Sequence, residues 1–138
     1  MKAAEYFNNG YSCSESIIME AIEKGLVPEE LLSAATSFSG GMGSGCLCGA
    51  IAGSQIVLGY VLGRSNARAA AKKFIEEFKK NHKATCCRVL TAGLDMASPE
   101  RKAHCTNMVN DCSKILEEMI KVKVWCLIEL CSKKEYFS

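Results

Sequence analysis

The sequence contains only two prolines, and its aromatic residues amount to 7% of the chain. Both figures disfavour a β-sandwich, which needs many turns. An excess of one charge is also lacking, since 17 basic residues stand against 15 acidic ones and the net charge is +2. Proteins that bind nucleic acid usually carry a strong basic excess. We therefore expect no nucleic-acid partner.

Long apolar runs are missing as well. No charged residue lies between Glu30 and Arg64, but the apolar part of this stretch, residues 49–63, spans only 15 residues. A transmembrane helix needs about 20. The first ten residues, MKAAEYFNNG, lack the apolar segment of a secretory signal. We expect a cytoplasmic protein without a membrane span.

The length of 138 residues suits one domain, because globular domains commonly have about 100–150 residues. Apolar residues recur at helical spacing along most of the chain. We predict an all-α fold, a compact bundle of about six helices around a central apolar helix rich in Gly and Ala, over residues 49–63. Residues 1–138 would form this single cysteine-rich domain.

The C-terminal region allows two interpretations. Ser98 and Pro99 open one helical segment, and the apolar spacing from Cys105 to Leu130 indicates a long last helix. Residues 121–124, however, alternate between Lys and Val in the manner of a strand. The sequence leaves a short strand at this point as the alternative.

Cysteine is over-represented, with nine in a chain of 138 residues. Cytoplasmic thiols are kept reduced, and an odd number cannot pair completely, so metal or redox chemistry is the first interpretation. No C-x-x-C motif is present, which removes the usual signature of a zinc ribbon, a thioredoxin site or an attached haem. The nine are Cys13, Cys46, Cys48, Cys86, Cys87, Cys105, Cys112, Cys126 and Cys131.

Four segments place a cysteine near the expected start of a helix. Cys13 follows the capping-box residue Ser12, and Cys48 follows a glycine-rich loop over residues 39–45. Cys87 lies just after Thr85, and Cys105 is expected at the start of the last helix. The positive end of the helix dipole favours a thiolate, so we expect lowered pKa values at these cysteines.

The remaining candidates have simpler interpretations. Cys112, Cys126 and Cys131 fall on the apolar stripe of the last helix, where cysteine behaves as a small core residue. His104 adjoins Cys105 and is an alternative metal ligand, whereas His82 ends a lysine-rich helix and is expected in solvent.

Several motifs together resemble one known family. They are residues 11–16 (YSCSES), residues 39–43 (SGGMG), residues 48–53 (CGAIAG), residues 87–90 (CRVL), and Cys105 with residues 115–118 (ILEE). This set is similar to the C_GCAxxG_C_C family of small redox-active proteins, and the similarity extends over roughly residues 4–120. A related domain occurs in split-Soret cytochromes, where cysteines hold an iron–sulfur cluster.

The resemblance implies a ligand set and a cofactor. The four family cysteines fall on Cys13, Cys48, Cys87 and Cys105, which would hold an iron–sulfur cluster, possibly [2Fe–2S]. Gly49 and Gly53 would allow a cluster, or another backbone, to approach the central helix closely. The extra thiols Cys46 and Cys86 adjoin two of the four and leave the ligand set open.

The function expected from these features is electron transfer to a partner oxidoreductase or electron carrier, without catalytic residues of its own. The alternatives are a thiol–disulfide protein without metal, a structural zinc module, or cysteines that only pack. The apolar last helix is also consistent with a homodimer.

Overall fold

The computed structural model describes residues 1–95 and 97–136, with side chains described up to Lys121. Within this part of the chain every regular element is helical, which confirms the all-α prediction. The elements are α1 (Ala3–Asn8), α2 (Cys13–Glu23), α3 (Leu31–Thr36), the wide turn η1 (Gly41–Gly45), α4 (Gly49–Leu62), α5 (Ala67–His82), α6 (Cys87–Leu90) and α7 (Pro99–Tyr136).

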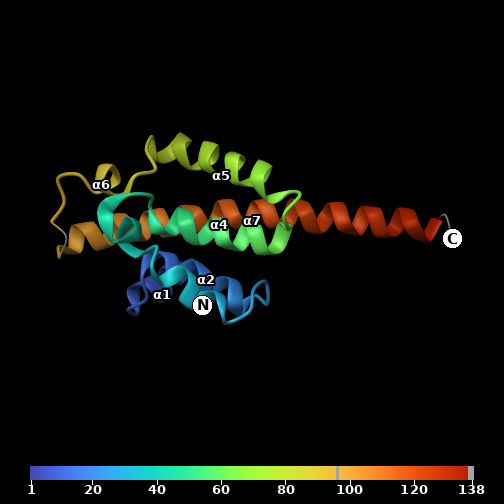
Figure 1. Ribbon diagram of the computed structural model, residues 1–138, viewed down its shortest axis with the longest axis horizontal. Helices are drawn as coiled ribbons and strands as arrows, with labels where there is room; N and C mark the ends of the chain where they lie inside the picture. The colour runs from blue at the N-terminus through green and yellow to red at the C-terminus, as the bar shows by residue number, and fades with distance from the viewer. Residues whose placement is uncertain (96, 137–138) are drawn as a thin grey trace.

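The central position predicted for the glycine-rich apolar helix is confirmed. Helix α4 contacts α2, α3, α5 and α7. Figure 1 shows α4 beside α7 in the middle, with α5 on one side and α1 and α2 on the other. Because its sequence is apolar on every face, α4 is stable only when surrounded by other helices. Ala50, Ile51, Val57 and Leu58 are accordingly fully buried.

Helix α5 is amphipathic and covers one side of this pair. Phe74 and Phe78 are fully buried, while its lysines lie on the exposed face. At the end of the helix, His82 stacks on the ring of Phe78 at a centroid distance of 4.4 Å and contacts Asp111 at 2.6 Å. The expectation that His82 lies in solvent was therefore wrong, because α7 supplies a carboxylate where α5 ends.

Helix α7 is one continuous helix of 38 residues. Met108, Val109, Cys112, Leu116 and Ile120 form its buried stripe, with the three-four spacing expected from the sequence. Residues 121–124 continue this helix, so the alternative of a strand was wrong. Figure 1 shows that the C-terminal part of α7 projects well beyond the other helices.

No helix in the described part of the chain combines the length and the apolar character needed to cross a bilayer.

Candidate functional site

Cys13 is the first residue of α2. The hydroxyl of the preceding Ser12 accepts a hydrogen bond from the backbone N–H of Glu15 at 3.3 Å, and the Glu15 carboxylate accepts one from the N–H of Ser12 at 3.0 Å. This is the predicted capping box, which satisfies two backbone donors at once. It fixes the helix start and therefore the position of Cys13.

A short antiparallel β-bridge brings the segments of Cys48 and Cys87 together. Leu47 pairs with Cys86. The N–H of Cys48 donates to the carbonyl of Thr85 at 2.8 Å, and the N–H of Cys87 donates to the carbonyl of Cys46 at 2.5 Å. Directly after this bridge, Cys48 becomes the N-cap of α4 and Cys87 opens α6.

The glycine-rich turn η1 closes over the same bridge. Gly41 has a φ of +66°, and a Cβ at this position would lie 2.6 Å from the backbone nitrogen of Cys46 and 2.8 Å from the Cβ of Cys87. Only glycine fits there. Arg88 of α6 donates to the carbonyl of Ser44 at 3.1 Å. The turn is thus anchored to α6.

Cys105 reaches the site in a different way from the other three. The last helix begins at Pro99, so Cys105 lies in its second turn and not at its start as expected. The earlier start has a local cause, because the hydroxyl of Ser98 accepts a hydrogen bond from the N–H of Arg101 at 3.1 Å and so caps the helix. The position of Cys105 follows from the packing of α7 against α1 and α4.

The four family cysteines line one cavity of about 280 Å³. Their segments lie far apart in the sequence and meet where α2, α4, α6 and α7 converge. The other residues that line the cavity are Phe7, Ser12, Gly40, Gly49, Ala50, Arg101 and Met108. Cys46, Cys86 and Cys112 are not among the lining residues, and Cys112 is a fully buried core residue as expected. Cys126 and Cys131 lie outside the described side chains.

The two glycines singled out in the sequence serve different contacts. A Cβ on Gly49 would lie 2.3 Å from the sulfur of Cys13, so the missing side chain makes room for that thiol. A Cβ on Gly53 would lie 2.7 Å from the carbonyl oxygen of Ser14. Gly53 therefore allows the backbones of α2 and α4 to approach and does not line the cavity.

Burial dominates the electrostatics of the cavity. Cys48 is only 5% exposed, and burial raises its pKa to about 12, although the N–H groups of Ile51 and Ala50 act in the opposite direction. Burial also raises the pKa of Cys87 and of Cys105. The expectation of lowered pKa values at these three was wrong, because desolvation of a thiolate outweighs the dipole of a helix start.

Arg101 supplies the positive charge of the site. It lies one helical turn before Cys105, and its guanidinium lowers the pKa of Cys87 and of Cys105, although less than burial raises them. This residue was not among the candidates predicted from the sequence. Its spacing of four residues before a candidate ligand on a helix was the signal that was available.

The donor set of the cavity fits a group that binds through sulfur. Four thiols line it, and neither a carboxylate nor an imidazole does. Thiolates select iron–sulfur clusters, zinc and Cu(I). Among the described residues no three Cys, His, Asp or Glu side chains are grouped closely enough for a single ion.

The alternative ligand His104 is turned to another partner. Its Nε2 lies 2.7 Å from the carbonyl oxygen of Leu90, and the residue is not part of the cavity lining. His104 therefore links α7 to the end of α6.

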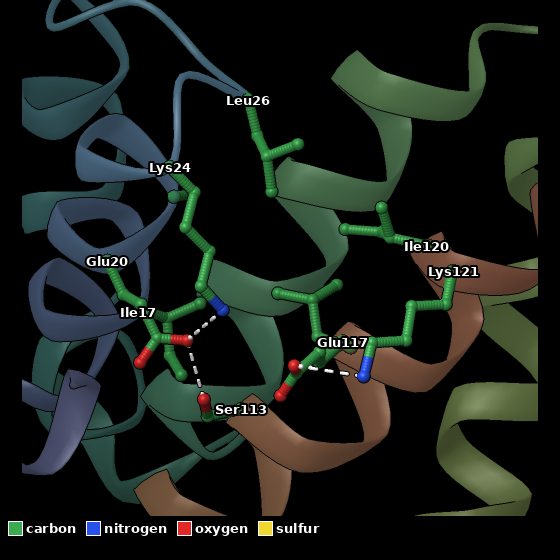
Figure 2. A pocket seen from close by; sticks show the side chains of 10 residues that line it. Ile17, Glu20, Lys24, Leu26, Ser113, Glu117, Ile120 and Lys121 are labelled. Carbon is green, nitrogen blue, oxygen red and sulfur yellow. Dashed lines mark hydrogen bonds and ion pairs between the residues drawn. The ribbon is translucent and has the colours of Figure 1, made fainter. Parts of the chain in front are cut away.

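A second cavity, of about 260 Å³, lies between α2 and α7 and contains no cysteine (Figure 2). Ile17, Leu26 and Ile120 form apolar walls. The Glu20 carboxylate accepts hydrogen bonds from Lys24 at 3.0 Å and from Ser113 at 2.7 Å. Its polar groups thus pair with one another, and nothing in this cavity points to redox chemistry.

Comparison with known proteins shows a family match. Residues 11–119 match the family model described as "Putative redox-active protein (C_GCAxxG_C_C)". No curated protein and no solved structure matches the chain significantly.

Proposed function

The chain belongs to the C_GCAxxG_C_C family of redox-active proteins, and from this premise we propose that Cys13, Cys48, Cys87 and Cys105 bind an iron–sulfur cluster. One observation carries the proposal: the cavity of about 280 Å³ is lined by these four thiols, and Arg101 is the one charged residue among the described residues that line it. Four cysteine thiolates are the complete ligand set of a [2Fe–2S] or [4Fe–4S] cluster. We favour [2Fe–2S].

A bound cluster supplies one-electron transfer. The surrounding residues provide the electrostatics. Binding requires the four thiols to lose their protons, and the Arg101 guanidinium offsets part of the negative charge that results. The N–H groups of Ala50 and Ile51 donate to the sulfur of Cys48, and such bonds raise the potential of a cluster. Electrons would pass to a partner oxidoreductase or electron carrier.

The test is the elemental content of protein that is purified without oxygen. We expect iron and acid-labile sulfide in equal amounts and a coloured protein. Cys48→Ser and Cys105→Ser should each lose most of the iron. The matched control is Cys46→Ser, because Cys46 is exposed and lies outside the cavity. Colourless wild-type protein without iron or sulfide, even after reconstitution, would contradict the proposal.

A thiol–disulfide protein is the second candidate, since four free thiols around one cavity would also allow a disulfide to form. The raised pKa values of Cys48, Cys87 and Cys105 argue against it, because a thiol attacks a disulfide only as the thiolate. This candidate predicts metal-free protein whose mass falls by two hydrogens on oxidation. Mass spectrometry of the intact chain distinguishes the two.

A further inference from the structure

A wider cleft opens beside the cysteine cavity. It has a volume of about 550 Å³ and shares Phe7, Ser12, Arg101 and Cys105 with the cavity. The site proposed above is therefore adjacent to a depression large enough for a small molecule. Tyr11, Ser98 and Lys102 are among the residues that complete its walls.

The charges of the cleft favour an anion. Arg101 and Lys102 line it, and Glu15 is the single acidic residue among the described residues of its walls. Glu15 already accepts hydrogen bonds from Ser12 and from Thr36 at 2.9 Å, and these bonds lower its pKa. The cleft thus has a net positive charge, and its acidic group is occupied by bonds within the protein.

Lys102 is held in place within the cleft. Its ammonium donates to the carbonyl of Phe7 at 2.7 Å and lies 3.6 Å from the centre of the Phe7 ring. A cation that is fixed in this way loses little side-chain entropy when it meets a ligand. Tyr11 and Ser12 line the same cleft and each carries a hydroxyl, a group that donates well to carboxylate or oxyanion oxygens. The hydroxyl of Ser98 already donates to the carbonyl of Asp95 at 2.8 Å.

We propose that this cleft binds a small carboxylate or inorganic oxyanion against Arg101 and Lys102, next to Cys105. The inference rests on the proposed redox function, to which it adds a small anionic ligand bound beside the cysteine cavity. Arg101 belongs to both the cysteine cavity and the cleft, since it faces the thiols of Cys87 and Cys105 and also lines the cleft.

The test compares two alkylating reagents on the reduced, metal-free full chain. Iodoacetate is an anion and iodoacetamide is neutral, and the exposed Cys46 serves as the internal reference. We expect the iodoacetate-to-iodoacetamide rate ratio to be about three- to ten-fold higher at Cys105 than at Cys46, an effect of the local cations. Peptide mass spectrometry resolves the two positions.

Two variants and one control assign the effect. Arg101→Gln and Lys102→Met should each bring the ratio at Cys105 towards that at Cys46. The control Lys114→Met removes a cation from the same helix but outside the cleft, and should leave the ratio unchanged. Equal ratios at Cys105 and Cys46 in the wild type, or a ratio that neither cleft variant alters, would overturn the proposal.

A second arm uses protein that carries iron. Reduction by dithionite, an anion, should slow in Lys102→Met relative to reduction by reduced methyl viologen, a cation. An unchanged ratio of the two rates counts against the cleft. Because the alkylation arm needs no metal, the cleft and the proposed cluster fail independently.

Discussion

At the scale of single residues, Cys48 shows two opposing effects on one thiol. It is the N-cap of α4 and receives backbone N–H groups, yet its side chain is buried. Its pKa of about 12 shows that burial is the larger effect. The sequence indicated the helix start correctly, but it contained no measure of how deeply the thiol would be buried.

This raised pKa has a consequence for stability at high pH. The folded chain keeps the Cys48 proton at pH values where the unfolded chain releases it. The stabilisation is complete below about pH 9 and is lost as the pH rises towards 12. In metal-free protein we expect the free energy of unfolding to fall in this range by up to about 1 kcal/mol per pH unit. We expect the free energy of unfolding, measured by urea at several pH values, to fall less steeply with pH in Cys48→Ala than in the wild type. An identical dependence on pH would contradict the prediction.

Glu20 gives the opposite pH dependence. Burial would raise its pKa, but hydrogen bonds from Ser113, the N–H of Ala3 and Lys24 together lower it. Its contribution to stability is therefore present above about pH 4.5 and is lost as the pH falls. Glu20→Gln should destabilise the chain by about 1–3 kcal/mol at pH 7 and flatten the acid side of the stability profile.

The control for Glu20 is Glu117, which lines the same cavity between α2 and α7. Glu117 pairs with Lys121 at 3.3 Å, and its side chain is 48% exposed. An exposed pair of this kind contributes little to stability. Glu117→Gln should therefore have almost no effect. Equal losses in the two variants, measured by urea unfolding, would show that the burial of Glu20 has no importance.

At the scale of elements, α4 was predictable in type and position, because an uncharged, glycine-rich helix without a polar face has to be buried among other helices. The extent of α7 was harder to predict. The sequence marks Ser98, Pro99 and Cys105 as three separate signals, and only packing against α1 and α4 shows that they belong to one helix. Local signals thus gave the first residue of this helix, Pro99, but not its unbroken course through Cys105.

Two glycines of α4 provide a matched pair of substitutions. Gly49→Ala places a methyl group 2.3 Å from the sulfur of Cys13, whereas the same change at Gly59 meets no atom within 4 Å. We expect Gly49→Ala to cost about 1–3 kcal/mol and to lower the iron content. Gly59→Ala should be neutral or stabilising by up to about 1 kcal/mol, as alanine favours a helix.

Thermal unfolding and iron assays on both variants check this prediction. Cys13→Ala in the Gly49→Ala background removes the clash with the sulfur and leaves only the contact with the Phe38 carbonyl oxygen at 3.0 Å, so it should recover part of the stability without recovering iron. Stable, iron-loaded Gly49→Ala protein would show that the cavity adapts more readily than its geometry indicates.

At the scale of the whole molecule, the meeting of the four cysteines could not be predicted from spacing alone. Cys13 and Cys105 are joined only through the packing of α2, α4 and α7, and sequence spacing contains no information about such contacts. The resemblance to a family supplied the set of four, and the structure places them around one cavity. Arg101 was missed because its role depends on a neighbour, Cys87, from another element.

The projecting end of α7 leads to a prediction about assembly. Residues 122–131 read VKVWCLIELC, with Lys123 and Glu129 as the only charged residues. A helix that is apolar on nearly every face is normally buried against another chain or element. We therefore expect self-association to a dimer, which a chain ending at Lys121 should lose. Light scattering after gel filtration measures both masses, and a monomeric full-length chain would contradict the expectation.

The contact between Cys13 and Gly49 makes the residue allowed at one position depend on the residue at another that is distant in sequence. The sulfur atom lies in the space that any larger residue at position 49 would need. In a relative that lacks the first cysteine this clash is absent, and a Cβ at position 49 would then meet the carbonyl oxygen of Phe38 at 3.0 Å, a tight contact that a small shift relieves. A relative that retains the cysteine keeps the requirement for glycine. Substitutions at these two positions should therefore co-vary among homologous chains, in one direction only.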